Sequence, residues 1–258
     1  MKPKALILHA NGTNRDREAA WAFELAGADA EIVHLNQLRA GARRWDDYQL
    51  LAIPGGFSYA DSLGAGRLLA IDLMVYFADA LRAYIAAGKP VIGICNGFQA
   101  LVRAGLLPDG PSGNGRATLT FNASGHFECR WVHLVPGSRA CVWTRDLAEP
   151  LYCPVAHGEG RLVLAESRSS EASRAGGQAA LLYAGGDGHT AEGAYPANPN
   201  GSLYDIAGLC NATGTVLGLM PHPEDHIVAA QHPRWARGET GGLALSLFVN
   251  GVAYARGL

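Results

Sequence analysis

The stretch VIGICNGFQAL (residues 91–101) predicts a buried strand, a sharp turn and a helix, with Cys95 at the turn. Residues 91–94 are short, apolar and mostly β-branched, which is typical of a parallel strand covered on both faces. After Cys95 the apolar side chains are spaced three and four residues apart, which is the helical period. Gly93 and Gly97 lie two residues on either side of the cysteine, as in a nucleophile elbow. We expect that no larger residue fits at either position.

The predicted turn would make Cys95 reactive. Backbone N–H groups and the positive end of the following helix favour the thiolate over the thiol. The N–H of Asn96 would also face an oxyanion formed on a carbonyl that Cys95 attacks. The alternative is a buried structural cysteine in a tight turn, and the paired glycines favour the nucleophile.

Composition limits the classes of function. The chain has 258 residues, enough for one large α/β domain, and a net charge of −2 that leaves no basic surface for nucleic acid. No apolar stretch approaches the ~18 residues of a membrane-spanning helix, so we expect no membrane segment. The five cysteines are widely spaced and include no C-x-x-C pair, which favours a reduced, cytoplasmic protein without a disulfide framework.

Strand and helix patterns alternate in the N-terminal half. Strands are expected at 5–9, 30–35 and 50–53, and helices at 15–26 and, as one long amphipathic segment, at 68–85. This alternation predicts an α/β fold in which residues 1–258 form a single domain. Its open sheet would be mainly parallel, with helices on both faces.

The C-terminal half is richer in strand patterns. Strands are expected at 118–121, 129–135 and 161–164, and a hairpin is expected from 206–209 and 216–220. The polar stretch 167–178 is expected to be an exposed loop, and residues 242–255 a closing helix.

A pair of glycines follows the strand expected at 50–53. In an open α/β sheet, ligands bind at the carboxyl ends of the strands, where Cys95 is also expected. Gly55 and Gly56 could therefore offer backbone N–H groups to the ligand that Cys95 attacks. An ordinary glycine turn is the alternative.

A thiol nucleophile needs a base and a group that orients the base, and two His-x-Glu pairs qualify. They are His157 with Glu159 and His222 with Glu224. In extended backbone, residues two apart point the same way, so each carboxylate could lie beside its own histidine. The spacing alone leaves open which pair serves Cys95.

A metal site is the competing interpretation of His222, Glu224 and His226. Pro223 opposes the continuous helix that an H-E-x-x-H site needs, and no further ligand stands out. We therefore expect no metal. Surface histidines without a role are the other alternative.

Five motifs together resemble the class I glutamine amidotransferases, and among them the glutaminase subunits of phosphoribosylformylglycinamidine synthases. The motifs cover most of the chain and are, in order, PGGFSYAD (54–61), GICNGFQ (93–99), AHGEGR (156–161), NPNGS (198–202) and PHPE (221–224). The elbow alone would indicate only the wider class. The resemblance implies a flavodoxin-like glutaminase domain.

The resemblance also implies roles for individual residues. It makes Cys95 the nucleophile, His222 the general base and then acid, and Glu224 the carboxylate that orients His222. It thereby selects His222 over His157. The groups that it places around the substrate glutamine are Gly55, the oxyanion-hole N–H groups of Gly56 and Asn96, and the side chain of Gln99.

The resemblance further implies L-glutamine as substrate and a separate synthetase subunit as partner, joined in some lineages by a small third subunit. That synthetase would use ATP and Mg²⁺ to convert formylglycinamide ribonucleotide to the amidine. The present chain contains no G-x-x-x-x-G-K-[ST] motif, and no cofactor is expected on it. The alternatives are a class I glutaminase of another synthase and a non-catalytic scaffold with the same fold.

Overall fold

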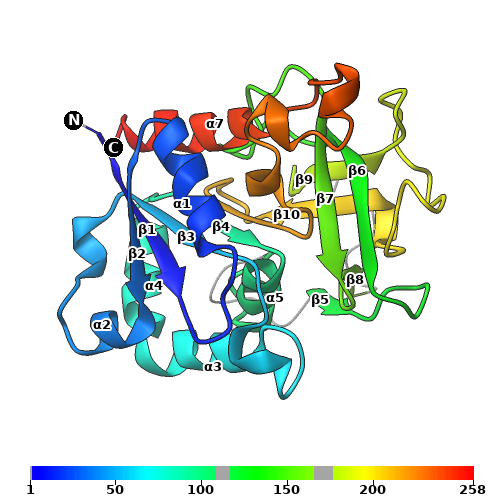
Figure 1. The fold of residues 1–258 in the computed structure, drawn as a ribbon. Helices are drawn as coiled ribbons and strands as arrows, with labels where there is room; N and C mark the ends of the chain where they lie inside the picture. Colours follow the sequence, from blue (N-terminus) through cyan, green and yellow to red (C-terminus); the bar gives the residue numbers. More distant parts are fainter. Residues whose placement is uncertain (1, 109–116, 166–176) are drawn as a thin grey trace.

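A nine-stranded sheet is the centre of the computed structural model, which describes residues 2–108, 117–165 and 177–258 (Figure 1). The strands follow the spatial order β2 (Asp29–His34), β1 (Lys4–His9), β3 (Leu50–Ile53), β4 (Val91–Ile94), β11 (Val216–Leu219), β10 (Ile206–Cys210), β9 (Ala179–Ala184), β6 (Glu128–Pro136) and β7 (Leu151–His157). A separate two-stranded sheet pairs β5 (Ala117–Thr120) with β8 (Arg161–Leu164).

Helices cover the parallel part of the sheet on both faces. Figure 1 shows α1 and α7 on one side and α3, α4 and α5 on the other. The bounds are α1 (Asp16–Leu25), α2 (Leu35–Arg39), α3 (Arg67–Tyr76), α4 (Ala78–Ala86), α5 (Asn96–Arg103) and α7 (Leu245–Ala255). The buried strands β1, β3 and β4 explain the unbroken apolar runs that their sequences show. The predicted α/β class, with helices on both faces, is confirmed.

Strand direction changes at β11. The strands from β2 to β11 pair in parallel, and those from β11 to β7 pair antiparallel. The hairpin of β10 and β11 is present as expected. Strands β7 and β9 were not expected from the sequence. Strand β7 carries Pro154, which is tolerated because β7 lies at the sheet edge, and β9 is rich in alanine, a weak strand former.

Three expectations about the helices and loops need correction. The single helix expected at 68–85 is wrong: Phe77 has a φ of −133°, which separates α3 from α4. The closing helix begins at Leu245 rather than at residue 242, where the backbone of Gly242 has a φ of +78°. Most of the loop expected at 167–178 lies outside the described residues, but Gln178 is buried and donates a hydrogen bond to the carbonyl of Pro108.

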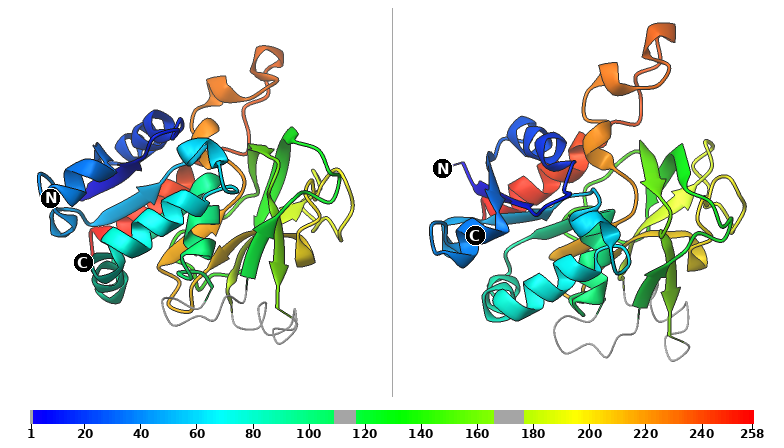
Figure 2. Two further views of the ribbon diagram at one scale, coloured as in Figure 1. Left: turned by 90° about the horizontal axis from the view of Figure 1, so that it is seen from below. Right: turned by 60° about the horizontal axis from the view of Figure 1, so that its bottom comes forward.

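Short 3₁₀ helices occupy several connections at the sheet edges. They are η1 (Trp45–Asp47), η2 (Ser58–Asp61), η3 (Leu203–Asp205), η4 (Pro223–Asp225), η5 (Ala229–Gln231) and η6 (Trp235–Arg237). The last two belong to the segment 229–242, which projects away from the sheet in both views of Figure 2. None of the helices described is long and apolar enough to cross a membrane.

Close packing around the elbow explains its glycines. A Cβ on Gly97 would lie 1.9 Å from the carbonyl oxygen of Ile53, and one on Gly93 would lie 2.5 Å from Cδ1 of Leu101. The expectation that nothing larger fits is confirmed. Helix α5 therefore packs directly on β3 and β4, and this places its first turn at the carboxyl edge of the sheet.

Candidate active site

Cys95 stands in a strained backbone conformation between β4 and α5. Its φ of +49° and ψ of −103° are rare for a residue with a side chain and cost about 1–3 kcal/mol. The N–H of Cys95 donates to the carbonyl of Leu219 on β11 at 2.7 Å, and its thiol lies 3.8 Å from the carbonyl oxygen of Ala156. The residue is 5% exposed. The fold thus presents Cys95 at the end of β4, beside the ends of β11 and β7.

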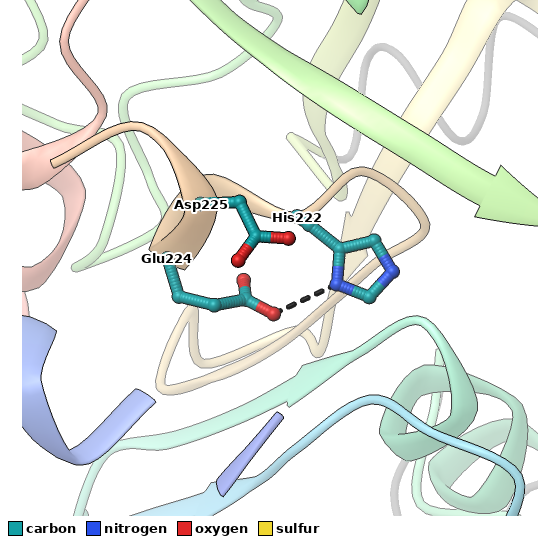
Figure 3. Close-up of side chains that lie close together, drawn as sticks. All are labelled: His222, Glu224 and Asp225. Atoms are coloured by element: carbon teal, nitrogen blue, oxygen red, sulfur yellow. Dashed lines mark hydrogen bonds and ion pairs between the residues drawn. The ribbon is translucent and has the colours of Figure 1, made fainter. Parts of the chain in front are cut away.

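His222 and Glu224 form a buried pair (Figure 3). Nδ1 of His222 lies 2.7 Å from Oε1 of Glu224. The side chain of Cys95 lies close enough to the imidazole to raise its pKa. The pairing arises from a turn rather than from extended backbone, because Pro223 begins η4. The sequence therefore predicted the contact, but the reason given for it was wrong.

The charge of His222 follows from its neighbours. Burial disfavours the imidazolium, but the negative charges of Glu224 and Cys95 and their hydrogen bonds outweigh burial and raise the pKa of His222 well above its usual value. At neutral pH the histidine is therefore a buried cation. A cation in that place stabilises a thiolate and can give up a proton to a leaving group.

His157 lies in the same region but in a different environment. Nδ1 of His157 lies 3.1 Å from Oδ1 of Asn122, and Nε2 faces the side-chain amide of Asn200. Burial and the nearby positive charge of His222 lower the pKa of His157 to about 3, so the ring is neutral. The expected pairing of His157 with Glu159 is wrong, since Gly158 follows the last residue of β7 and ends the extended backbone there.

Glu159 points toward α5 and the loop before α3. Its carboxylate lies 3.4 Å from Arg103 and accepts a hydrogen bond from the N–H of Ala65. Its backbone carbonyl accepts from Nε2 of Gln99 at 2.7 Å, and Oε1 of Gln99 accepts from Asn96. Both ends of the Gln99 amide are therefore engaged within the protein.

The glycine pair after β3 lies against the imidazole. A Cβ on Gly55 would lie 2.6 Å from Cε1 of His222 and 3.5 Å from the Cβ of Cys95. Gly56 has a φ of +140°, which glycine adopts readily. Asn96 is the first residue of α5, where an N–H has no acceptor in a preceding turn. The structure therefore brings together the glycines, Cys95, His222 and Asn96.

A cavity of about 180 Å³ opens above this group. It is lined by residues that include Gly56, Phe57, Asp61, Cys95, Gln99, Ala156 and His157, which belong to the motifs found in the sequence, and also Phe121 and Phe127, which do not. Phe121 and Phe127 follow β5 and precede β6. A periodic pattern in the sequence could not predict that the segment between β5 and β6 lies beside the ends of β4 and β11.

Among the residues that the structure describes, one group of donor atoms is compact enough to suggest a metal. Donor atoms of His222, Glu224 and Asp225 lie within 4.8 Å of one another. Nδ1 of His222 is occupied by its hydrogen bond to Glu224 and is therefore not free to bind a metal. His226 does not join this group, because its Nδ1 points to the carbonyl of Tyr152.

Together, the cysteine at an elbow, the His–Glu pair after the adjoining strand and the α/β sheet define the class of glutamine amidotransferases. A family model described as the CobB/CobQ-like glutamine amidotransferase domain matches residues 2–255.

Known relatives narrow this class. The phosphoribosylformylglycinamidine synthase subunit PurQ of Treponema denticola is 51% identical, over 98% of this chain and 99% of its own length. PurQ of Dehalococcoides mccartyi is 45% identical over 99% and 98%. The solved structure of PurLQS from Thermotoga maritima matches with a TM-score of 0.75 and 32% identity, covering 98% and 99% of the two chains. The chain therefore belongs to the PurQ family.

Proposed function

We propose that this chain is the glutaminase subunit of a phosphoribosylformylglycinamidine synthase. It hydrolyses L-glutamine to glutamate and ammonia through a γ-glutamyl thioester on Cys95 and delivers the ammonia to a synthetase subunit. The observation that carries the proposal is the placement of a strained elbow cysteine and the buried His222–Glu224 pair side by side against Gly55, beneath a cavity of about 180 Å³. The names of the relatives support the choice of synthase.

The reaction has two halves. The Cys95 thiolate attacks the side-chain amide carbon of glutamine, and the N–H groups of Gly56 and Asn96 hold the resulting oxyanion. The imidazolium of His222 gives its proton to the departing ammonia, and a thioester remains. Neutral His222 then takes a proton from water, which attacks the thioester and releases glutamate. Glu224 keeps the ring oriented through both halves.

Gly55 and Gln99 shape the substrate site in this proposal. Gly55 leaves space for the imidazole, because any side chain there would meet it. Gln99 was expected to help hold glutamine. Since its amide is bonded to Glu159 and Asn96, we assign it to positioning the cavity wall against the substrate.

The names of the relatives indicate the partner of this chain. They are subunits of a synthase, and the Thermotoga structure is one of PurLQS. For this chain we propose a synthetase subunit that holds ATP and Mg²⁺, a small third subunit, and no cofactor or metal of its own. The proposal includes no nucleic-acid partner, in line with a net charge of −2.

Two further parts of the proposal concern the whole chain. Residues 1–258 would act as a single domain, since one core lies on both faces of the large sheet. The five cysteines are all free, which fits a reducing compartment and supports a cytoplasmic location.

The test compares two nitrogen sources. In the complex of this chain with its synthetase, glutamine and added ammonium salts should both support formation of the amidine, and a glutamine-analogue electrophile should block only the glutamine reaction, with its adduct on Cys95. A chain that activates a different synthase would instead indicate another amidotransferase of the class. A chain that forms no adduct would be a scaffold.

A further inference from the structure

Arg15 connects the two segments that enclose the imidazole of His222. It is the residue before α1, and its N–H donates to the carbonyl of Gly55 at 3.3 Å. Its side-chain Nε lies 3.6 Å from Oδ2 of Asp225, which immediately follows Glu224. Gly55 lies against one side of the ring and Asp225 belongs to the turn that carries it. A single residue thus joins both segments.

Asp225 is the third charged group of the turn. Figure 3 shows its carboxylate beside that of Glu224, and donor atoms of both and of His222 lie within 4.8 Å of one another. The Oε2 atom of Glu224 is buried and has no hydrogen-bond partner among the described residues. Two carboxylates and one imidazolium are therefore held close together, and the guanidinium of Arg15 supplies a second positive charge.

The other titratable groups around Asp225 do not supply a positive charge that would offset its carboxylate. Glu18 on α1 pairs with Arg15 at 3.2 Å and adds negative charge, and Cys153 on β7 is a buried thiol. Helix α7, which also packs on η4, carries Tyr254 as its one titratable residue. Burial and the charge of Glu224 raise the pKa of Asp225 to about 6, while His222 and Arg15 oppose the rise. Asp225 is therefore ionised above that pH.

We propose that Arg15 and Asp225 form a positioning pair that holds the turn of His222 and Glu224 against Gly55, and that their opposite charges set the pH at which the imidazolium loses its proton. The proposal rests on the function proposed above and extends it to two residues that do not touch the substrate. Asp225 adds a negative charge near the ring, and Arg15 offsets that charge.

This arrangement predicts opposite effects for the two residues. Removing the negative charge in Asp225→Asn makes the imidazolium lose its proton at a lower pH. Removing the positive charge in Arg15→Met leaves Asp225 and Glu18 uncompensated, so the imidazolium persists to a higher pH. The double variant removes both charges, so its imidazolium should lose the proton at nearly the same pH as in the unchanged protein.

The test measures carboxymethylation of Cys95 by iodoacetate against pH, with the site identified by peptide mass spectrometry. Attack on this anionic reagent is fastest while the thiolate stands beside an imidazolium, so the rate falls when His222 deprotonates. We expect the pH at which the rate falls on the alkaline side, called the alkaline limb, to be lower by on the order of half a pH unit in Asp225→Asn. In Arg15→Met it should be higher by a similar amount.

Two controls separate charge from structure. Arg17→Met removes the same charge from the exposed side of the same helical turn and should leave the limb in place. Arg15→Lys keeps the charge and should also leave it in place. Shifts of both single variants in one direction, or no shift in either, would overturn the proposal. The readout needs no glutamine turnover, so a protein that shows the shifts without hydrolysing glutamine refutes the proposed function alone.

Discussion

The imidazole of His222 lies against Gly55, where an added Cβ would stand 2.6 Å from its Cε1 atom. Gly55→Ala should therefore displace the ring from Cys95 and reduce glutamine hydrolysis by ~100-fold or more, since a shift of about 1 Å can cost that much. The measurement is kcat/KM for glutamine in the complex, beside ammonia-dependent synthesis, which should be retained. Gly241→Ala is the matched control, because a Cβ there meets nothing within 4 Å. Unchanged turnover in Gly55→Ala would show that the ring tolerates displacement.

The strained backbone of Cys95 predicts a difference between two inactive variants. Cys95→Ala and Cys95→Gly should both lose glutamine-dependent synthesis and retain ammonia-dependent synthesis. Glycine adopts the φ of +49° at this position without the steric cost of a Cβ, so Cys95→Gly should be more stable than Cys95→Ala by about 1 kcal/mol. Chemical denaturation measures the difference. Loss of ammonia-dependent synthesis in both variants would mean that Cys95 serves the structure of the complex.

The two histidines near Cys95 should differ in their effect on rate. His222→Asn removes the acid and base and should lower kcat by about 10²–10⁴-fold. His157→Gln should have a smaller effect, because the neutral ring contacts Asn122 and Asn200 rather than Glu159. Steady-state hydrolysis of glutamine by the complex measures both. A larger loss in His157→Gln than in His222→Asn would reverse the assignment of the base.

The low pKa of His157 predicts a dependence of stability on pH. The folded state holds this ring neutral to a pH of about 3, whereas an unfolded chain binds the proton near pH 6.5. Unfolding therefore becomes easier as the pH falls from about 6.5 toward 3, by up to ~1.4 kcal/mol per pH unit from this residue. Denaturation at several pH values should show a shallower decline in His157→Gln. Parallel pH profiles for the two proteins would contradict this cause.

The raised pKa of His222 acts in the opposite range. Its ion pair with Glu224 contributes stability that is fully present below pH ~6.5 and is lost as the pH rises through the higher folded-state pKa. The free energy of unfolding of the unchanged protein should therefore fall on the alkaline side. In His222→Asn that fall should be weaker, as thermal or urea denaturation between pH 7 and the alkaline limit would show. An equal fall in the free energy of unfolding of both proteins would mean that titratable groups other than His222 cause it.

The elements that position the nucleophile could be predicted because each shows a clear local pattern. Strand β4 and helix α5 differ in hydrophobic period, and the period changes at Cys95. The glycines on either side of it allow the strand and the helix to pack closely. The antiparallel half was harder to predict, since β9 is alanine-rich and β7 contains Pro154. The break at Phe77 between α3 and α4 has no glycine or proline to indicate it.

The candidate site could likewise be predicted only in part. Side-chain chemistry indicated which residues could react, but the spacing of His157 and Glu159 predicted a contact that requires extended backbone, and Gly158 ends it. His222 and Glu224 meet through a 3₁₀ turn instead. The cavity wall formed by Phe121 and Phe127 depends on how distant segments meet, which local patterns do not specify.

The hydrogen bond from the N–H of Cys95 to the carbonyl of Leu219 joins the end of β4 to the end of β11, and β11 leads directly to the turn of His222. The sulfur and the imidazole are therefore held by two paired central strands. Separating them would require two central strands to part. In the proposed complex we expect a docking subunit to act on ammonia production through the mouth of the cavity, where Phe57 and Phe127 are about half exposed, rather than by moving Cys95 away from His222.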